Sequence, residues 1–270
     1  MTLKTASMST LDPVWEGIRG ECLAAVEREP RLGALLHGGI LRHETLEGAL
    51  AWRFAMKLAS SEMSEQFLRE MADAAHADDP GLGIAARADL RAVHERDPAC
   101  HYLMQPILFF KGYQAVQAWR VAHWLWGRGQ HELAWFVQMR ISELFGVDIH
   151  PAARIGQGLM IDHAHSIVIG ETAVVGDDVS LLHSVTLGGT GKSDGDRHPK
   201  IGNGVLIGAG ASVLGNITVG ECARIAAGSV VLSDVPGWTT VAGVPARIVG
   251  QSGSERPSVA MDQLLVNGAG

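Results

Sequence analysis

One histidine and one aspartate in the second half of the sequence have the chemistry of a general base and its partner. His163 lies in the run Ile161-Asp162-His163-Ala164, and Asp148 lies shortly before that run. An imidazole titrates near neutral pH and can take a proton from a hydroxyl or thiol, provided a carboxylate fixes its tautomer and supports its charge. We predict that His163 is this base and that Asp148 is its carboxylate. An ordinary surface histidine on a polar turn is the alternative.

Charged residues that could hold a zwitterion occur in two other parts of the sequence. Arg197 and His198 lie in a segment rich in Gly and Asp, where a guanidinium can clamp a carboxylate with paired hydrogen bonds. Asp97 and Asp162 are candidate partners for an ammonium group. The alternatives are a solvated loop charge for Arg197 and a turn-forming role for Asp97, which precedes Pro98.

Two further histidines raise the possibility of a metal site. The spacing of His165 and His183 matches one full turn of a repeat, so they would stack as zinc ligands if they occupied equal positions on adjacent turns. Two extra residues between them put them out of phase, so we predict no metal ligands. We expect His150 and His183 to be structural or solvent-facing.

Composition divides the chain at about residue 148. Fourteen of the 15 aromatic residues lie before residue 149, whereas glycine rises from 12 in residues 1–148 to 18 in the shorter span 149–250. Before the break, apolar residues recur at helical spacing, as at Met63, Phe67 and Met71, and prolines such as Pro106 fall between these patterns. We therefore predict a helical N-terminal domain over residues 1–147.

After the break, apolar residues recur every six positions. Twelve of thirteen such positions are Ile or Val: Ile149, Ile155, Ile161, Ile167, Ala173, Val179, Val185, Ile201, Ile207, Val213, Val219, Ile225 and Val231. Helices and single strands have other periods, but a triangular coil of about 18 residues has this one. We predict an α+β chain with a left-handed parallel β-helix of hexapeptide repeats over 148–250 and a flexible tail over 251–270. A glycine-rich β-sandwich is the alternative.

The six-residue repeat is interrupted twice, and ionisable residues gather at both places. Pairs of an apolar residue and glycine step by 14 instead of 12 between Ile155 and Ile169, and again between Leu187 and Ile201. We expect each slip to add two residues. Extra residues in a stacked solenoid must bulge or loop outward, and such irregularities tend to be functional.

Charge, hydropathy and cysteine spacing exclude several classes of protein. The net charge of −7, from 29 acidic and 22 basic residues, does not indicate the basic surface that binds nucleic acid or an anionic membrane. No apolar run approaches the roughly 20 residues that span a bilayer, and residues 1–13 lack the apolar centre of a signal peptide. Cys22, Cys100 and Cys222 show neither metal-ligand nor disulfide spacing, so we expect a cytoplasmic protein with free thiols.

Segments from both halves of the chain resemble serine O-acetyltransferases of the hexapeptide-repeat acyltransferase superfamily. They are Arg96-Asp97-Pro98-Ala99, Lys111-Gly112-Tyr113-Gln114-Ala115, Ala122-His123-Trp124-Leu125-Trp126, Asp148-Ile149-His150-Pro151-Ala152-Ala153, Ile161-Asp162-His163-Ala164, Gly170-Glu171-Thr172-Ala173, Ser184 to Lys192, Gly195 to Lys200 and Ala242 to Arg247. The resemblance covers roughly residues 90–250. It implies acetyl transfer from acetyl-CoA to the hydroxyl of L-serine, giving O-acetyl-L-serine for cysteine biosynthesis, with no tightly bound cofactor.

The resemblance also implies roles for individual residues. They are His163 as base with Asp148 orienting it, Arg197 and His198 on the serine carboxylate, Asp97 and Asp162 on its ammonium, and Gly189, Ala209, Ala227 and Arg247 at CoA. The implied assembly is a trimer or a dimer of trimers with sites between subunits. L-Cysteine, which would use the same zwitterion contacts, is implied as a feedback inhibitor.

Two departures from the family pattern limit what the resemblance implies. His165-Ser166 stands where the pattern has Thr-Gly, and the sequence ends Val266-Asn267-Gly268-Ala269-Gly270. Family members insert a terminal isoleucine into O-acetylserine sulfhydrylase, so this ending argues against that partner. An acyltransferase acting on a sugar or another hydroxy amino acid remains an alternative, as does a zinc protein of the γ-carbonic anhydrase type.

Overall fold

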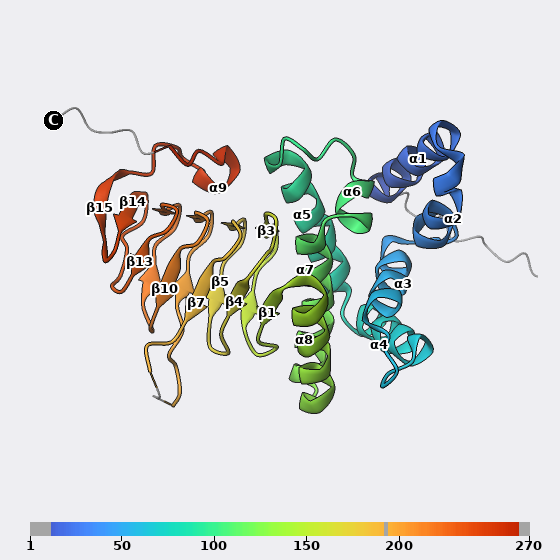
Figure 1. Cartoon of the computed structure of the whole chain (residues 1–270), viewed down its shortest axis with the longest axis horizontal. Coiled ribbons are helices and arrows are strands. Elements are labelled where there is room, and N and C mark those ends of the chain that lie inside the picture. Colours follow the sequence, from blue (N-terminus) through green and yellow to red (C-terminus); the bar gives the residue numbers. More distant parts are fainter. Residues whose placement is uncertain (1–11, 192–193, 265–270) are drawn as a thin grey trace, which may run out of the picture.

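The structure, a computed structural model, describes residues 12–191 and 194–264. Figure 1 shows a group of helices at one end of the molecule and a stack of short strands at the other. The helices form the first part of the chain and the strands the second, as predicted from the composition. None of the described helices is both long enough and apolar enough to cross a membrane.

In the helical part, capping residues and prolines of the sequence account for where several helices begin. The helices are α1 (Pro13–Arg28), η1 (Pro30–Leu32), α2 (Gly33–Leu36), η2 (His37–Leu41), α3 (Leu46–Leu58), α4 (Glu65–Asp78), α5 (Pro80–Arg96), α6 (Met104–Leu108), α7 (Lys111–Gly127) and α8 (His131–Phe145). Asp12, Thr45, Ser64 and Asp79 cap four of them through their side chains. Pro106 lies inside α6 rather than between helices, because its first-turn position needs no N–H partner.

The strand part is a parallel β-helix, which confirms the predicted fold class. Three sheets form its sides: β1 (Val147–Ile149), β4 (Ile167–Ile169), β7 (Thr186–Gly188), β10 (Ser212–Leu214) and β13 (Val230–Val231); β2 (Arg154–Ile155), β5 (Val174–Val175), β8 (Lys200–Ile201) and β11 (Thr218–Val219); and β3 (Met160–Ile161), β6 (Ser180–Leu181), β9 (Leu206–Ile207), β12 (Arg224–Ile225), β14 (Thr239–Gly243) and β15 (Ala246–Gln251). All pairs are parallel except β14 with β15. One apolar core runs from α3 and α4 through α7 and α8 into these coils.

The strand register locates both interruptions of the repeat. A regular turn of the coil joins Ser212 to Val230, which are paired on neighbouring strands. The pairing of Val147 with Ile167 spans a turn that is longer by two residues, so the first slip has the predicted size.

The second slip is larger than predicted. Thr186 pairs with Ser212, and the turn between them exceeds a regular one by considerably more than the two residues expected. The prediction was wrong because the loop after β7 leaves the coil and extends away from the prism (Figure 1). The length of this loop therefore does not have to fit the six-residue repeat of the coil.

The segment after β15 returns across the side of the coils. It includes α9 (Pro257–Ala260), and the Ser180 hydroxyl donates to the Ser258 carbonyl at 2.8 Å. Arg256 pairs with Asp178 at 3.0 Å, and Arg224 donates to the Asp262 carbonyl at 3.0 Å. These contacts place residues 252–264 against the prism, and the flexibility expected of residues 251–270 stays a prediction. Residues 265–270, with the ending discussed above, lie outside the described residues.

Candidate active site

A cavity of about 530 Å³ lies where the helical part meets the first coil. Its walls come from the end of α5, the start of α7 and the segment after β3. Asp97, Asp162 and His163, which are distant in sequence, all line this cavity. The structure thus brings together three of the six residues predicted for catalysis and serine binding.

The two added residues of the first slip shape the floor of this cavity. His163, Ala164 and Ser166 all have positive φ, at 56°, 53° and 55°, a conformation that costs free energy for residues other than glycine. Gly112 permits the fit from the helical side, since a Cβ there would lie 2.2 Å from the Ile161 carbonyl oxygen. The start of α7 therefore sits directly on the bulge.

The predicted base is accessible in the single chain. The His163 side chain is 72 % exposed, and its Nε2 lies 3.7 Å from Asp162 Oδ2, beyond hydrogen-bond distance. Its ring meets His183 edge-on, with centroids 5.8 Å apart. Asp148, in β1, accepts a hydrogen bond from Gln138 Nε2 at 2.7 Å. Within the described residues Asp148 makes no hydrogen bond to His163, so their pairing stays a prediction.

Asp97 serves as a turn former and still faces the cavity. Its Oδ1 accepts a hydrogen bond from the Ala99 N–H at 2.8 Å, which accounts for its place before Pro98. Arg96 anchors this end of α5, donating to the Gly158 carbonyl at 3.0 Å and to Asp178 at 2.9 Å. The second carboxylate oxygen of Asp97 remains available to a ligand.

Arg197 and His198 form a second cluster on another corner of the prism. Arg197 pairs with Glu171 at 2.7 Å and so holds the pKa of that carboxyl below its usual range. His198 Nδ1 lies 2.9 Å from Thr172 Oγ1, and burial lowers the pKa of its imidazole. Their corner joins the β1 sheet to the β2 sheet, whereas His163 lies where the β3 sheet joins the β1 sheet. Neither residue lines the 530 Å³ cavity of its own chain.

The residues predicted at CoA fall on different parts of the prism. Ala209 and Ala227 lie on successive turns of the same corner as His163, and the Gly228 N–H donates to the Ala209 carbonyl at 2.8 Å. Gly189 lies beside Arg197, whose carbonyl oxygen would be 3.5 Å from a Cβ there. Arg247 is exposed on β15. The single chain does not bring these four residues together.

Lys111 and His165, for which the sequence predicted no role in substrate binding, also line the cavity. Lys111 is the first residue of α7, and its Nζ lies 2.9 Å from His165 Nδ1. A lysine at the start of a helix carries no sequence signal of its own, and the sequence raised His165 only as a possible metal ligand and as a departure from a family pattern. His165 faces Lys111, while His183 faces His163. The described residues hold no group of three or more potential metal ligands.

The cysteine thiols are poorly suited to carry an acyl group. Burial raises the pKa of Cys100 to about 11 and also raises that of Cys222. Because the thiolate is the nucleophile, a thiol with a raised pKa is unreactive near neutral pH. Burial raises the pKa of Cys22, a residue on the buried face of α1, to about 12.

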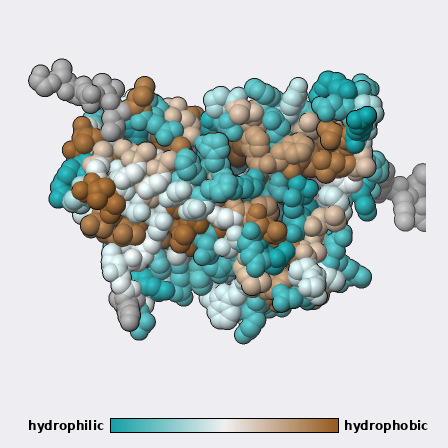
Figure 2. Space-filling model, in the orientation of Figure 1, coloured by the Kyte–Doolittle hydropathy of each residue, from teal (hydrophilic) through white to brown (hydrophobic). Residues whose placement is uncertain are grey.

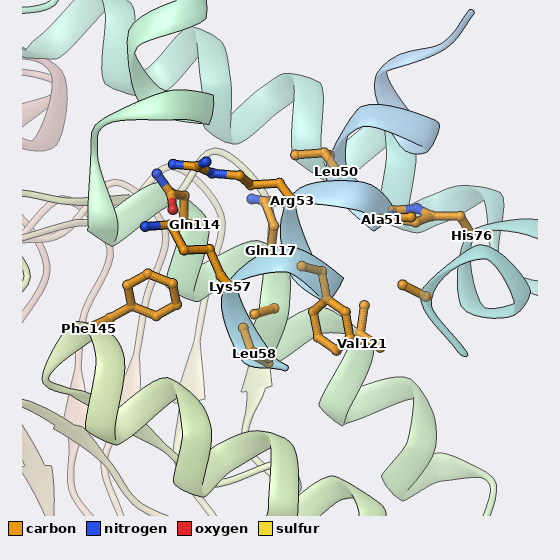
Figure 3. Close-up of a pocket in the computed structure, with 13 residues that line it drawn as sticks. Leu50, Ala51, Arg53, Lys57, Leu58, His76, Gln114, Gln117, Val121 and Phe145 are labelled. Carbon is orange, nitrogen blue, oxygen red and sulfur yellow. The ribbon is translucent and has the colours of Figure 1, made fainter. Parts of the chain in front are cut away.

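A second cavity lies between α3, α4, α7 and α8, shown in Figure 3. Its polar lining residues are Arg53, Lys57, His76, Gln114 and Gln117, and the rest are apolar. Its volume of about 20 Å³ has room for about one water molecule. An amino acid or a thioester needs far more space. The 530 Å³ cavity, which holds Asp97, Asp162 and His163, is therefore the candidate active site.

Comparison with known proteins decides the family. Residues 14–118 match the family model "Serine acetyltransferase, N-terminal", and residues 198–233 match "Bacterial transferase hexapeptide (six repeats)". The serine acetyltransferase of Salmonella typhimurium is 54 % identical over 94 % of this chain and 93 % of its own length. The chain belongs to the serine acetyltransferase family. The crystal structure of the Vibrio cholerae serine acetyltransferase is 54 % identical, with a TM-score of 0.93 over 94 % of this chain and 98 % of that one.

Three similar serine acetyltransferase structures are complexes. The Brucella abortus enzyme with coenzyme A is 52 % identical with a TM-score of 0.89, covering 92 % of this chain and 99 % of its own. The Neisseria gonorrhoeae enzyme with serine is 53 % identical with a TM-score of 0.85, covering 88 % and 97 %. A complex with cysteine is 49 % identical with a TM-score of 0.92, covering 94 % and 98 %.

Proposed function

We propose that this chain transfers the acetyl group of acetyl-CoA to the hydroxyl of L-serine, giving O-acetyl-L-serine and CoA for cysteine biosynthesis. The observation that carries the proposal is the cavity that joins Asp97 and Asp162 to His163, in a chain about half identical to serine acetyltransferases over most of its length. Two carboxylates match the ammonium of an amino acid, and the imidazole matches its hydroxyl.

His163 takes the hydroxyl proton as the oxygen attacks the thioester carbon. The C–O bond forms while the C–S bond breaks, and the proton passes from the imidazolium to the departing CoA sulfur. Asp148 supports the imidazolium in this account. The transfer is direct, because the raised thiol pKa values of Cys100 and Cys222 disfavour an acyl-enzyme.

A second copy of the chain completes the site. His163 is largely exposed in the single chain, and Arg197 and His198 lie on a different corner of the prism. In a trimer of prisms, the corner of one copy that carries Arg197 and His198 would lie against the corner of its neighbour that carries His163. Arg197 and His198 would then bind the serine carboxylate there. Figure 2 shows apolar surface at the β13–β15 end, where Leu232, Ile248 and Val249 are exposed, and such surface suits contact between copies.

Acetyl-CoA is a co-substrate that enters along the corner carrying His163, Ala209 and Ala227. Small side chains there let an extended ligand lie close to the backbone, with Gly189 and Arg247 contributed from elsewhere in the assembly. L-Cysteine shares every charge of the serine zwitterion, so we expect it to bind at the same site and inhibit. Three free cysteines support a reducing, cytoplasmic location.

An acceptor profile tests this function. CoA release from acetyl-CoA is followed with L-serine, L-homoserine and hydroxylated sugars at equal concentrations. L-Serine should exceed the sugars in kcat/KM by roughly 10-fold or more, because charge-assisted contacts hold only the amino-acid zwitterion. It should also exceed L-homoserine, whose hydroxyl lies one methylene farther from those contacts. A sugar that matched or exceeded L-serine would instead identify an acyltransferase of another specificity.

A further inference from the structure

Lys111 and His165 meet at the wall of the candidate active site. Lys111 Nζ lies 2.9 Å from His165 Nδ1, and both side chains line the cavity that contains Asp97, Asp162 and His163. An ammonium has hydrogens but no lone pair, so Lys111 donates and His165 accepts. This contact uses the His165 tautomer that carries its hydrogen on Nε2.

The charges around the cavity leave Lys111 free for an anion. Asp97 and Asp162 are its acidic lining residues, and Lys111 is the cation among the lining residues that does not depend on histidine protonation. In the described part of the chain, no carboxylate oxygen lies within 4.0 Å of Lys111 Nζ. A neutral imidazole occupies one of its three N–H donors, and two remain for a ligand.

The arrangement of these charges complements an amino acid. Two carboxylates and one ammonium lining the same cavity match a ligand that carries an ammonium and a carboxylate on neighbouring atoms. Arg197 is already paired with Glu171 on another corner, so it is not the cation of this wall. A carboxylate has about four lone-pair sites, and can therefore accept from Lys111 as well as from groups of a second copy.

We propose that Lys111 binds the carboxylate of the amino-acid substrate, and that His165 is a positioning residue that aims Lys111 into the cavity. The inference rests on the proposed function and names a further substrate contact within it. His165 holds the lysine stem in one direction, which reduces the conformational freedom lost when the carboxylate binds.

Removal of the substrate carboxylate gives the sharpest test. The kcat/KM values of wild type and Lys111→Gln are compared for L-serine and for L-serinamide, which keeps the ammonium and hydroxyl but lacks the carboxylate. Lys111→Gln should lower kcat/KM for L-serine roughly 10- to 100-fold, the range for a lost hydrogen bond between charged groups. The value for L-serinamide should change less than about 2-fold.

Control variants separate this contact from a structural effect. Lys111→Arg keeps the charge and should retain most of the preference for L-serine, and Lys57→Gln, in the other cavity, should leave the preference unchanged. An equal loss for both substrates in Lys111→Gln, or no loss for either, would overturn the proposal. Failure of the wild type to acetylate L-serine would overturn the proposed function itself and this inference with it.

A double-mutant comparison tests the role of His165. His165→Leu alone should lower the preference for L-serine over L-serinamide several-fold, because Lys111 loses its acceptor. In the Lys111→Gln background the same change should have no further effect on that ratio. Independent, multiplying effects of the two substitutions would overturn the positioning role.

Discussion

The imidazole of His198 fills the space that a side chain at Gly170 would need. A Cβ built on Gly170 would lie 2.0 Å from His198 Nε2 and 2.1 Å from its Cδ2. The opposite nitrogen of the ring lies 2.9 Å from Thr172 Oγ1, so the ring is held from both sides. His198 can therefore occupy this position only because residue 170 is a glycine.

Gly170→Ala should displace His198 without unfolding the coil. The ring has to rotate and give up its contact with Thr172, so the KM for L-serine should rise roughly 10-fold while the KM for acetyl-CoA changes little. Gly191→Ala is the matched control in the loop after β7, because a Cβ there meets no atom within 4 Å. Steady-state kinetics of both variants, with circular dichroism to check folding, decide the matter. An unchanged serine KM in Gly170→Ala would remove His198 from the account.

Arg197→Ala and Arg247→Ala should separate the two substrates. Loss of Arg197 removes a charge-assisted contact to the amino acid and should raise the KM for L-serine far more than that for acetyl-CoA. Arg247→Ala should do the reverse. Calorimetry should also show weaker L-cysteine binding in Arg197→Ala, and unchanged L-cysteine affinity there would mean that cysteine binds elsewhere.

Cys100→Ser should retain nearly all turnover. With a pKa of about 11, on the order of one Cys100 thiol in several thousand is ionised near pH 7.5. Mass spectrometry of the wild type mixed with acetyl-CoA alone should detect no acetylated cysteine. A strong loss of kcat together with an acetyl adduct on Cys100 would require a two-step route instead.

Acid should destabilise the fold through its buried histidines. Burial lowers the folded-state pKa of His43, His76, His150 and His198 below the ordinary value of 6.5. Below about pH 6.5 the unfolded chain therefore binds more protons than the folded one, and the free energy of unfolding falls as pH falls. Urea unfolding should show a lower midpoint at pH 5.5 than at pH 7.5. His76→Gln should narrow that difference, and equal midpoints for the wild type would contradict the linkage.

The fold was largely predictable because its determinants are local and periodic. Inward Ile and Val at every sixth position specify the coil, and an interruption of that period marks the bulge at His163. The loop after β7 was misjudged, since a segment that leaves the stack has no period to read. Docking of Ser258 on Ser180 was equally invisible, because it depends on three-dimensional proximity of unremarkable polar residues.

The site was predictable in its residue types and less so in its geometry. Asp97 reaches the cavity because Arg96 anchors the end of α5, and Lys111 reaches it because Gly112 lets α7 approach the coil. The positions of Asp97 and Lys111 at the cavity cannot be derived from their spacing in the sequence. The family resemblance, and not spacing, assigned Arg197 and His198 to the same ligand as Asp97 and Asp162, and the single chain holds them on another corner.

The account depends most on His163 as the base that activates the serine hydroxyl. His163→Asn preserves size and polarity but cannot take the proton, and it should be compared with wild type at saturating L-serine and acetyl-CoA, with CoA affinity measured by calorimetry. The account predicts that kcat falls by roughly 10²-fold or more while CoA affinity is unchanged. A variant that kept near-normal kcat under these conditions would contradict it.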